Sequence, residues 1–203
     1  MTPDPAAGSG PPRWCEAAFA ATVLVTALVL CLLSMRELGP TFDEVAHIAA
    51  GVDHIQRGEY VLNVEHPPLV KQIAGLALAP LHLRARLPAP APHGADAAAH
   101  YRNEQWLCGR DLLLTLNGGR ERTATILTVA RLPVLALSAL LLPILWLWAR
   151  TMLGPLAAAS ALVLAALCPT WLAHARLVHT DAPLTMFTTA ALAQAWWLRR
   201  RFS

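Results

Sequence analysis

Residues 17–35 read AAFAATVLVTALVLCLLSM, a run without a charged residue that is bracketed by Glu16 and Arg36. A helix that crosses a bilayer needs about 17–25 mostly apolar residues, so this run predicts a membrane-spanning helix. Its apolar core is longer than that of a signal peptide, and no small-residue cleavage site precedes Arg36. We therefore expect this helix to remain in the protein as an anchor.

Three further runs also lack charged residues, namely residues 132–149, 151–173 and 182–198. The whole chain is 56% hydrophobic and 14% charged, whereas soluble domains carry about 25% charged residues. The sequence thus predicts an all-α membrane protein with about four transmembrane helices. The segment between the first two runs, residues 36–131, is predicted to be a long outer loop.

The arginines in the short segments predict which side of the membrane each segment faces. Arg13 precedes the first run, Arg150 separates the second from the third, and residues 199–201 are three arginines after the fourth. The short segment on the other side carries Arg176 alone. Because short cytoplasmic segments are enriched in Lys and Arg, we expect the N-terminus in the cytoplasm and the loop outside.

Charge and composition exclude two classes of partner. The loop of residues 36–131 contains ten basic and ten acidic residues, and no basic stripe predicts a nucleic-acid partner. The sequence also has no Gly-rich phosphate loop, so we expect no nucleotide cofactor. Residues 1–15 are rich in Pro and Gly and are predicted to form a disordered cytoplasmic tail.

The outer loop has helical patterns of its own. Thr41 and Glu44 have the spacing of a capping box, and apolar residues then recur at helical spacing up to Gly58. This predicts an amphipathic helix over residues 42–57 that lies on the membrane surface, with Asp43, His47 and His54 on its polar face. A second interfacial helix is expected over residues 69–83, a Pro/Ala-rich exposed crossing over 87–99 and a third helix over 104–116.

Ionisable residues gather in three clusters on the outer side. They are Asp43-Glu44, the segment EHPPLVK at residues 65–71, and the segment HARLVHTD at residues 174–181. Each also has a structural explanation: helix capping, a proline turn with a snorkelling lysine, and a solvated loop whose Asp181 caps a helix. For the third cluster, the functional alternative is an ion pair of Asp181 and Arg176 at the mouth of a site. A zinc protease is disfavoured because the histidines lack the HExxH spacing.

The ordered set of these motifs resembles a known family, the phospholipid-carrier-dependent glycosyltransferases of the GT-C superfamily. These enzymes are related to protein mannosyltransferases and aminoarabinose transferases. The resemblance covers residues 37–197. It rests on Asp43-Glu44, His47, Gly58-Glu59-Tyr60, the segment from Glu65 to Lys71, Arg131-Leu132-Pro133, His174-Ala175-Arg176 and Asp181.

The resemblance implies that a sugar is moved from a polyprenyl-phosphate carrier onto an acceptor protein, lipid or glycan outside the cytoplasm, in a bacterial inner membrane. Asp43 corresponds to the catalytic acid of the first outer loop and Asp181 to the acid of the second. Glu44, beside Asp43, is a further catalytic candidate. A single carboxylate base that activates an acceptor attacking opposite the leaving group predicts inversion at the sugar.

The resemblance also implies groups for the carrier phosphate and for a divalent metal ion. His66, Lys71 and Arg176 are the candidate cations for the carrier phosphate, whose charge grows as the bond to the sugar breaks. Glu65 corresponds to a metal-binding acid, with His66 as its neighbouring ligand.

This chain is shorter than the enzymes that it resembles, so residues 16–203 are expected to correspond to the N-terminal part of such a transferase domain. Whether these residues are active alone is left open by the sequence. The alternative function is a non-catalytic membrane fragment, an assembly partner or a piece of a transporter.

Overall fold

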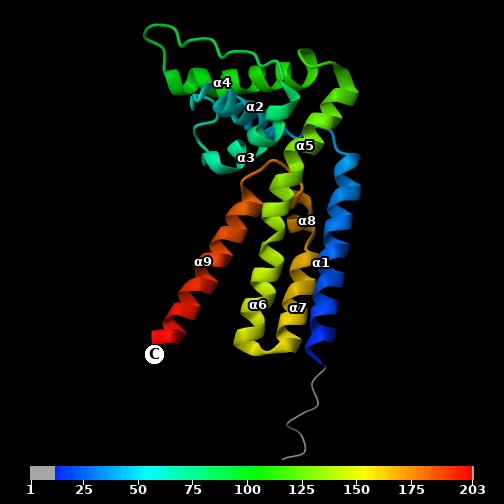
Figure 1. The fold of residues 1–203 in the computed structure, drawn as a ribbon. Coiled ribbons are helices and arrows are strands. Elements are labelled where there is room, and N and C mark those ends of the chain that lie inside the picture. The colour runs from blue at the N-terminus through cyan, green and yellow to red at the C-terminus, as the bar shows by residue number, and fades with distance from the viewer. Residues whose placement is uncertain (1–11, 203) are drawn as a thin grey trace, which may run out of the picture.

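The structure, a computed structural model, describes residues 12–202, and within that range every regular element is a helix and none is a strand. It has two parts, a long helical bundle and a cap of shorter helices at one end of it (Figure 1). The bundle contains α1 (Arg13–Arg36), α5 (Gly119–Ala139), α6 (Leu141–Leu153), α7 (Pro155–Ala166), α8 (Pro169–Ala175) and α9 (Asp181–Phe202). The cap contains α2 (Phe42–Arg57), α3 (Pro68–Leu78) with the 3-10 turn Ala79–Leu81, and α4 (Ala97–Arg110) with the π-helical turn Asp111–Thr115.

Two helices are long and apolar enough to cross a membrane. One is α1, and the other is the continuous run of α5 and α6 over Gly119–Leu153. The pair α7 and α8 meets the same criterion together, although the two helices are bent by 60° at residues 167–168, so the described residues offer two or three spans. The fourth expected span lies in α9, which is long enough but is made less apolar by three threonines and a glutamine.

The expected third span is broken rather than straight. α7 ends at Ala166, and Pro169 is the first residue of α8. Proline lacks a backbone N–H and fixes φ, so it starts a helix well but does not continue one. By contrast, Pro133 lies inside α5 without ending it, and α5 runs from Gly119 directly into the second expected span.

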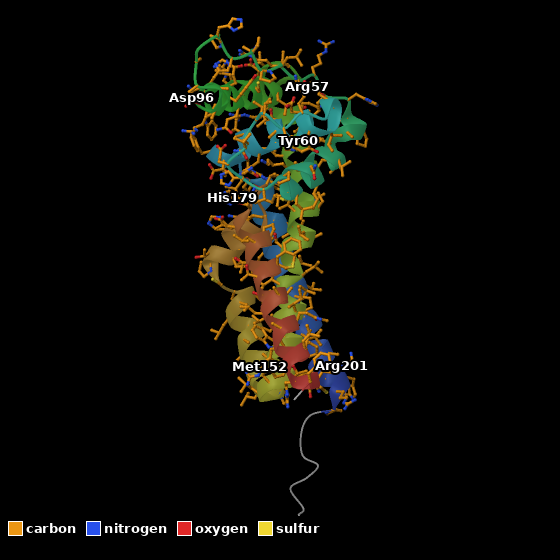
Figure 2. All side chains as sticks on the ribbon, turned by 90° about the vertical axis from the view of Figure 1, so that its left-hand side faces the viewer. Arg57, Tyr60, Asp96, Met152, His179 and Arg201 are labelled. Carbon is orange, nitrogen blue, oxygen red and sulfur yellow. The ribbon has the colours of Figure 1, made fainter. Side chains whose placement is uncertain are left out.

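Small and medium apolar side chains form the core of the bundle. Ala27 and Cys31 of α1 are buried against Leu162 and Ala166 of α7 in one cluster. Arg150 donates to Glu16 at 2.7 Å near the end of the bundle that lies away from the cap. Figure 2 shows Met152 and Arg201 at that same end. The arginines that follow the second and fourth expected spans therefore share one end of the molecule.

The cap is built around α2, which is a central helix and not a helix with one exposed polar face. His47 and His54, expected on that face, are 1% and 5% exposed. α2 packs against both α3 and α4, so the polar positions of its pattern face other helices. α2 begins and ends as predicted. α3 begins at Pro68, one residue before the predicted second helix, and the third begins at Ala97, seven residues earlier than expected.

Glycines bring the cap helices into backbone contact. A Cβ on Gly51 would overlap the carbonyl of Lys71 in α3, and one on Gly75 would overlap the carbonyl of Gly51. A Cβ on Gly109 in α4 would meet the carbonyl of Val45 in the same way. α2 is thus held between two helices at distances that only glycine permits.

We predict that Gly51→Ala destabilises the protein by about 1–3 kcal/mol, because the added methyl group must push α2 and α3 apart. The matched control is Gly39→Ala, since a Cβ on Gly39 would meet no atom within 4 Å. Thermal unfolding of both variants in the same detergent measures the difference. Equal unfolding midpoints for the two variants would contradict the close contact.

Candidate functional site

A buried ion pair joins the cap to the bundle. Arg131 of α5 and Glu44 of α2 are 1% and 0% exposed. Nε of Arg131 donates to Oε1 of Glu44 at 2.8 Å, and Nη2 donates to Oε2 at 2.6 Å, so the contact is bidentate. This is the geometry in which an arginine binds a carboxylate most strongly.

All remaining N–H groups of Arg131 bind carbonyls at the end of α1 or in the linker between α1 and α2. Nη1 donates to the carbonyls of Met35 and Leu38 at 3.2 and 2.9 Å, and Nη2 donates to the carbonyl of Gly39 at 2.8 Å. A guanidinium has five N–H donors, and each has an acceptor here. Arg131 therefore fixes the end of α1 and the start of α2 together.

Glu44 is equally saturated. Beyond the bonds from Arg131, it accepts from the backbone N–H of Val178 at 3.0 Å and from the backbone N–H and hydroxyl of Thr41 at 3.0 and 2.9 Å. Burial alone would raise the pKa of Glu44, but Arg131 and the backbone donors hold the pKa below its usual value. This carboxylate is buried and occupied, so its position is that of a structural anchor.

Asp43, the neighbour of Glu44, has the opposite character. Its side chain is 47% exposed, and Oδ2 lies 3.0 Å from Nε2 of His179, which precedes α9. Nδ1 of the same ring lies 3.3 Å from Oδ2 of Asp181. His179 thus stands between the two predicted catalytic acids and brings the start of α2 close to the start of α9. Figure 2 shows His179 at the junction of cap and bundle.

Asp181 also borders an apolar hollow of about 300 Å³ between the bundle helices. His174 lines the same hollow, and its Nδ1 lies 3.7 Å from Oδ2 of Asp181. The other walls are mainly apolar and come from α6, α7, α8 and α9: Leu141, Ala165, Cys168, Thr170, Trp171, Ala182 and Thr185. The ionisable residues that line this hollow are therefore His174 and Asp181, and the rest of the wall suits a hydrocarbon chain.

Two further histidines extend the cluster toward the cap. The ring of His47 lies 5.7 Å from that of His179 and 5.0 Å from that of His66, centroid to centroid. Burial lowers the pKa of His47 to about 4, and the nearby His66, His179 and Lys71 add to this shift. His47 is therefore neutral near pH 7. Its ring lies near His66, which precedes α3, and near His179, which precedes α9.

Glu65 and Lys71 hold the segment between α2 and α3. Nζ of Lys71 donates to the carbonyls of Asn63 and His66, and the side chain is 2% exposed. Burial lowers the pKa of Lys71 to about 8, although Glu65 partly opposes this. Oε1 of Glu65 accepts from the amides of Asn63 and Gln105 at 3.3 and 3.2 Å. The Lys71 ammonium thus points at main-chain carbonyls of the segment between α2 and α3.

Because the Lys71 ammonium binds main-chain carbonyls, Arg176 and His66 are the predicted phosphate-binding residues that stay available. Nε of Arg176 is buried and has no hydrogen-bond partner among residues 12–202. The alternative pairing of Arg176 with Asp181 is not formed in the described part of the chain, where Asp181 lies near His174 and His179 instead.

The residues expected to bind metal are not the ones whose donor atoms gather. Glu65 and His66 belong to no group of three or more ligand atoms in the described residues. Such a group is formed by His174, His179 and Asp181, whose ligand atoms all lie within 4.8 Å of one another. The structure therefore moves the candidate metal ligands from the first outer segment to the last.

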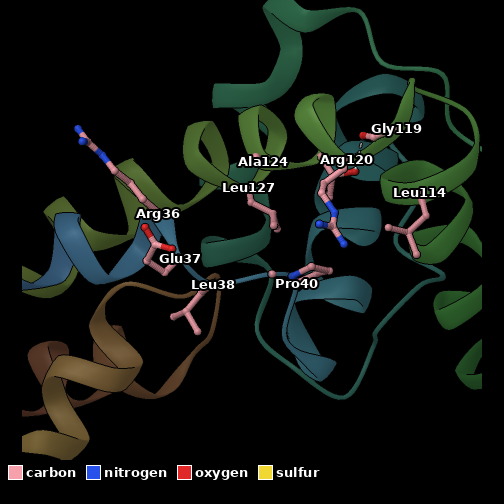
Figure 3. A pocket seen from close by; sticks show the side chains of 11 residues that line it. Arg36, Glu37, Leu38, Pro40, Leu114, Gly119, Arg120, Ala124 and Leu127 are labelled. Carbon is pink, nitrogen blue, oxygen red and sulfur yellow. Dashed lines mark hydrogen bonds between the residues drawn. The ribbon is translucent and has the colours of Figure 1, made fainter.

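A larger hollow of about 680 Å³ lies elsewhere, beside the linker between α1 and α2 and the start of α5. Figure 3 shows Arg120 pointing across it toward Pro40, while Arg36 points away. Apolar side chains of Leu114 and Leu127 form much of its wall. It contains none of the predicted site residues, so we place the candidate site at the junction around His179.

Sequence reasoning missed two residues that organise this junction. Arg131 was noted as part of a motif but received no role, and His179 was not singled out within the segment at residues 174–181. The signal available for Arg131 was its position at the boundary of an apolar run, together with Glu44 as a possible partner elsewhere in the sequence. For His179 the spacing to Asp181 was visible, but its approach to Asp43 depends on the tertiary fold.

Comparisons of this chain with protein-family models, curated proteins and solved structures found no match. A functional interpretation therefore rests on the residues and geometry described above.

We predict that Glu44→Gln costs about 3–5 kcal/mol, because Arg131 would keep a buried charge without its counter-ion. The matched control is Glu16→Gln, which removes a partly exposed pair with Arg150 and should cost less than about 1 kcal/mol. Chemical unfolding monitored by tryptophan fluorescence compares the two variants. Similar losses would show that the Arg131–Glu44 pair does not anchor the cap.

Proposed function

We propose that this protein transfers a sugar from a polyprenyl-phosphate carrier to an acceptor at the outer face of a membrane. The observation that carries the proposal is the half-exposed carboxylate of Asp43, which His179 holds beside Asp181 at the junction of cap and bundle. A general base must be both reachable and fixed in direction. Asp43 meets both conditions, whereas Glu44 is completely buried and serves as an anchor.

The proposed reaction needs one base and one leaving group. Asp43 takes the proton of an acceptor hydroxyl or amine as that atom bonds to the anomeric carbon. The bond from this carbon to the carrier phosphate breaks, and its electron pair leaves with the phosphate. Attack opposite the leaving group inverts the anomeric centre. The leaving phosphate is stable, so the protein mainly has to position the reactants and compensate the growing charge.

Two cations are available for the phosphate. Arg176 has a buried Nε without a partner among residues 12–202, and a guanidinium suits phosphate because its donors are planar and paired. His66 lies near His47 on the cap side. Lys71 acts indirectly in this scheme, because its ammonium holds the turn that carries Glu65 and His66.

The apolar hollow bordered by His174 and Asp181 supports a lipid carrier over a soluble donor. Its walls are mainly hydrocarbon, and Asp181, which lines it, lies beside His179. A polyprenyl chain presents the same division between an apolar tail and an anionic head. A nucleotide-sugar would require polar contacts to a base and ribose, which this hollow does not offer.

The proposal includes four membrane spans, with α9 as the fourth and the cap outside a bacterial inner membrane. Met152 and Arg201 lie at the end of the bundle opposite the cap (Figure 2), and Arg150 is two residues before Met152 in α6. This placement fits a cytoplasmic location of both arginines. Reporter fusions after Gly94 and after Ser203 test this arrangement. We expect an outside signal from the first and a cytoplasmic signal from the second, and an outside signal after Ser203 would contradict four spans.

We predict that Asp43→Asn reduces sugar transfer by about 100-fold or more, since general base catalysis contributes about 10²–10⁴-fold. Release of free polyprenyl phosphate from polyprenyl-phosphate hexose and pentose donors is measured in membranes that contain the full chain. The matched control is Asp96→Asn, because Asp96 caps α4 and asparagine caps helices equally well.

Full activity in Asp43→Asn would remove Asp43 as the base. If the unmodified chain transfers no sugar from any of these donors, the non-catalytic alternative, such as an assembly partner, is favoured instead.

A further inference from the structure

Three donor atoms, from the end of α8, the loop that follows it and the start of α9, lie close together. Nδ1 of His174 and Nδ1 of His179 lie 3.7 and 3.3 Å from the same carboxylate oxygen, Oδ2 of Asp181. With one ligand atom from each residue, the three atoms lie within 4.8 Å of one another. The segment HARLVHTD thus folds so that its ends and its second histidine face one another.

The hydrogen bonds of His179 indicate which ring nitrogen carries the proton. Nε2 faces Oδ2 of Asp43 at 3.0 Å, so it is the donor. The backbone N–H of Asp181 points at Nδ1 at 3.4 Å, which leaves Nδ1 as an acceptor. Nδ1 of the ring is directed at Oδ2 of Asp181, 3.3 Å away. Two ligand atoms that each lie about 2.0–2.2 Å from one tetrahedral ion are separated by a similar distance.

His174 provides a second, independent sign of a missing partner. Its Nδ1 atom is buried and has no hydrogen-bond partner among the described residues. Its distance to Asp181 is too long for a hydrogen bond. A buried polar atom without a partner costs free energy, and such atoms in a folded protein call for an explanation.

We propose that His174, His179 and Asp181 form a site for a divalent transition-metal ion, with zinc as the best chemical fit. Two imidazole nitrogens and one carboxylate oxygen are typical zinc ligands, whereas magnesium and calcium prefer oxygen alone. Three protein ligands leave one coordination position open. His174 and Asp181 also line the apolar hollow, so an exogenous oxygen ligand, such as a lipid phosphate, can reach that position.

Asp43 supports the site from the side opposite the metal. A histidine that binds metal through one nitrogen commonly donates its other N–H to a carboxylate, which fixes the ring and strengthens the ligand. The pair of Asp43 and His179 has this arrangement. Asp43 is thus a positioning residue for the metal site, and the site rests on its own geometry rather than on the proposed sugar transfer.

The metal alone tests the site. The full chain, purified in detergent without a histidine tag and stripped with a chelator, is titrated with Co²⁺ as a spectroscopic substitute for Zn²⁺. We expect one equivalent to bind with visible absorption bands, and Zn²⁺ to displace it. His174→Ala, His179→Ala and Asp181→Asn should each weaken Co²⁺ binding by more than about tenfold, and Asp43→Asn by about 10–100-fold.

The matched controls are His93→Ala and Asp96→Asn, which change residues of the crossing before α4 and should leave binding unchanged. Circular dichroism of each variant checks that its helices are intact, and a ligand variant that unfolds is replaced by His179→Gln. Absence of Co²⁺ binding in the unmodified chain would overturn the site, as would equal binding in the ligand variants. Metal binding without sugar transfer would retain the site and reject the transferase.

Discussion

The buried pair between Arg131 and Glu44 is the constraint on which the rest of the junction depends. Five N–H groups of one guanidinium bind one carboxylate, one carbonyl in the last turn of α1 and two carbonyls of the linker after it. The same carboxylate also binds the backbone N–H of Val178. The end of α1, the start of α2, the middle of α5 and the loop before α9 therefore meet at one point. Without this point, nothing else in the described residues fixes all four segments together.

The ionisable cluster around His179 is a consequence of that anchoring. Val178 is bound to Glu44. His179, the next residue along the chain, therefore lies beside Asp43, the residue that precedes Glu44. The buried pair of Glu44 and the partly exposed pair of Asp43 thus lie side by side, because the two acids are adjacent in sequence. The buried pair supplies rigidity, and the exposed pair keeps an oxygen available to solvent or substrate. This division explains how neighbouring acids in one helix turn have different environments.

The sequence alone was sufficient for the local features and insufficient for the tertiary ones. The limits of α2 follow from the capping box at Thr41 and the left-handed Gly58, both of which are local. The burial of His47 was not predictable from α2, because it depends on α3 and α4 on either side. The 60° bend after α7 had a visible signal in Pro169. Asp43 and Asp181 were both predicted as site residues, but the histidine that joins them was not. The anchor Arg131 was hidden because its partners are mostly backbone carbonyls.

The close contacts of the cap have a consequence for how its sequence can change. At Gly51, Gly75 and Gly109 the space for a Cβ is filled by main-chain atoms of a neighbouring helix or turn. A larger side chain elsewhere in a core is often accommodated when a partner becomes smaller, but a carbonyl group cannot be shortened by any substitution. These three positions therefore have no compensating partner, and the surrounding side chains can drift during evolution while the glycines stay.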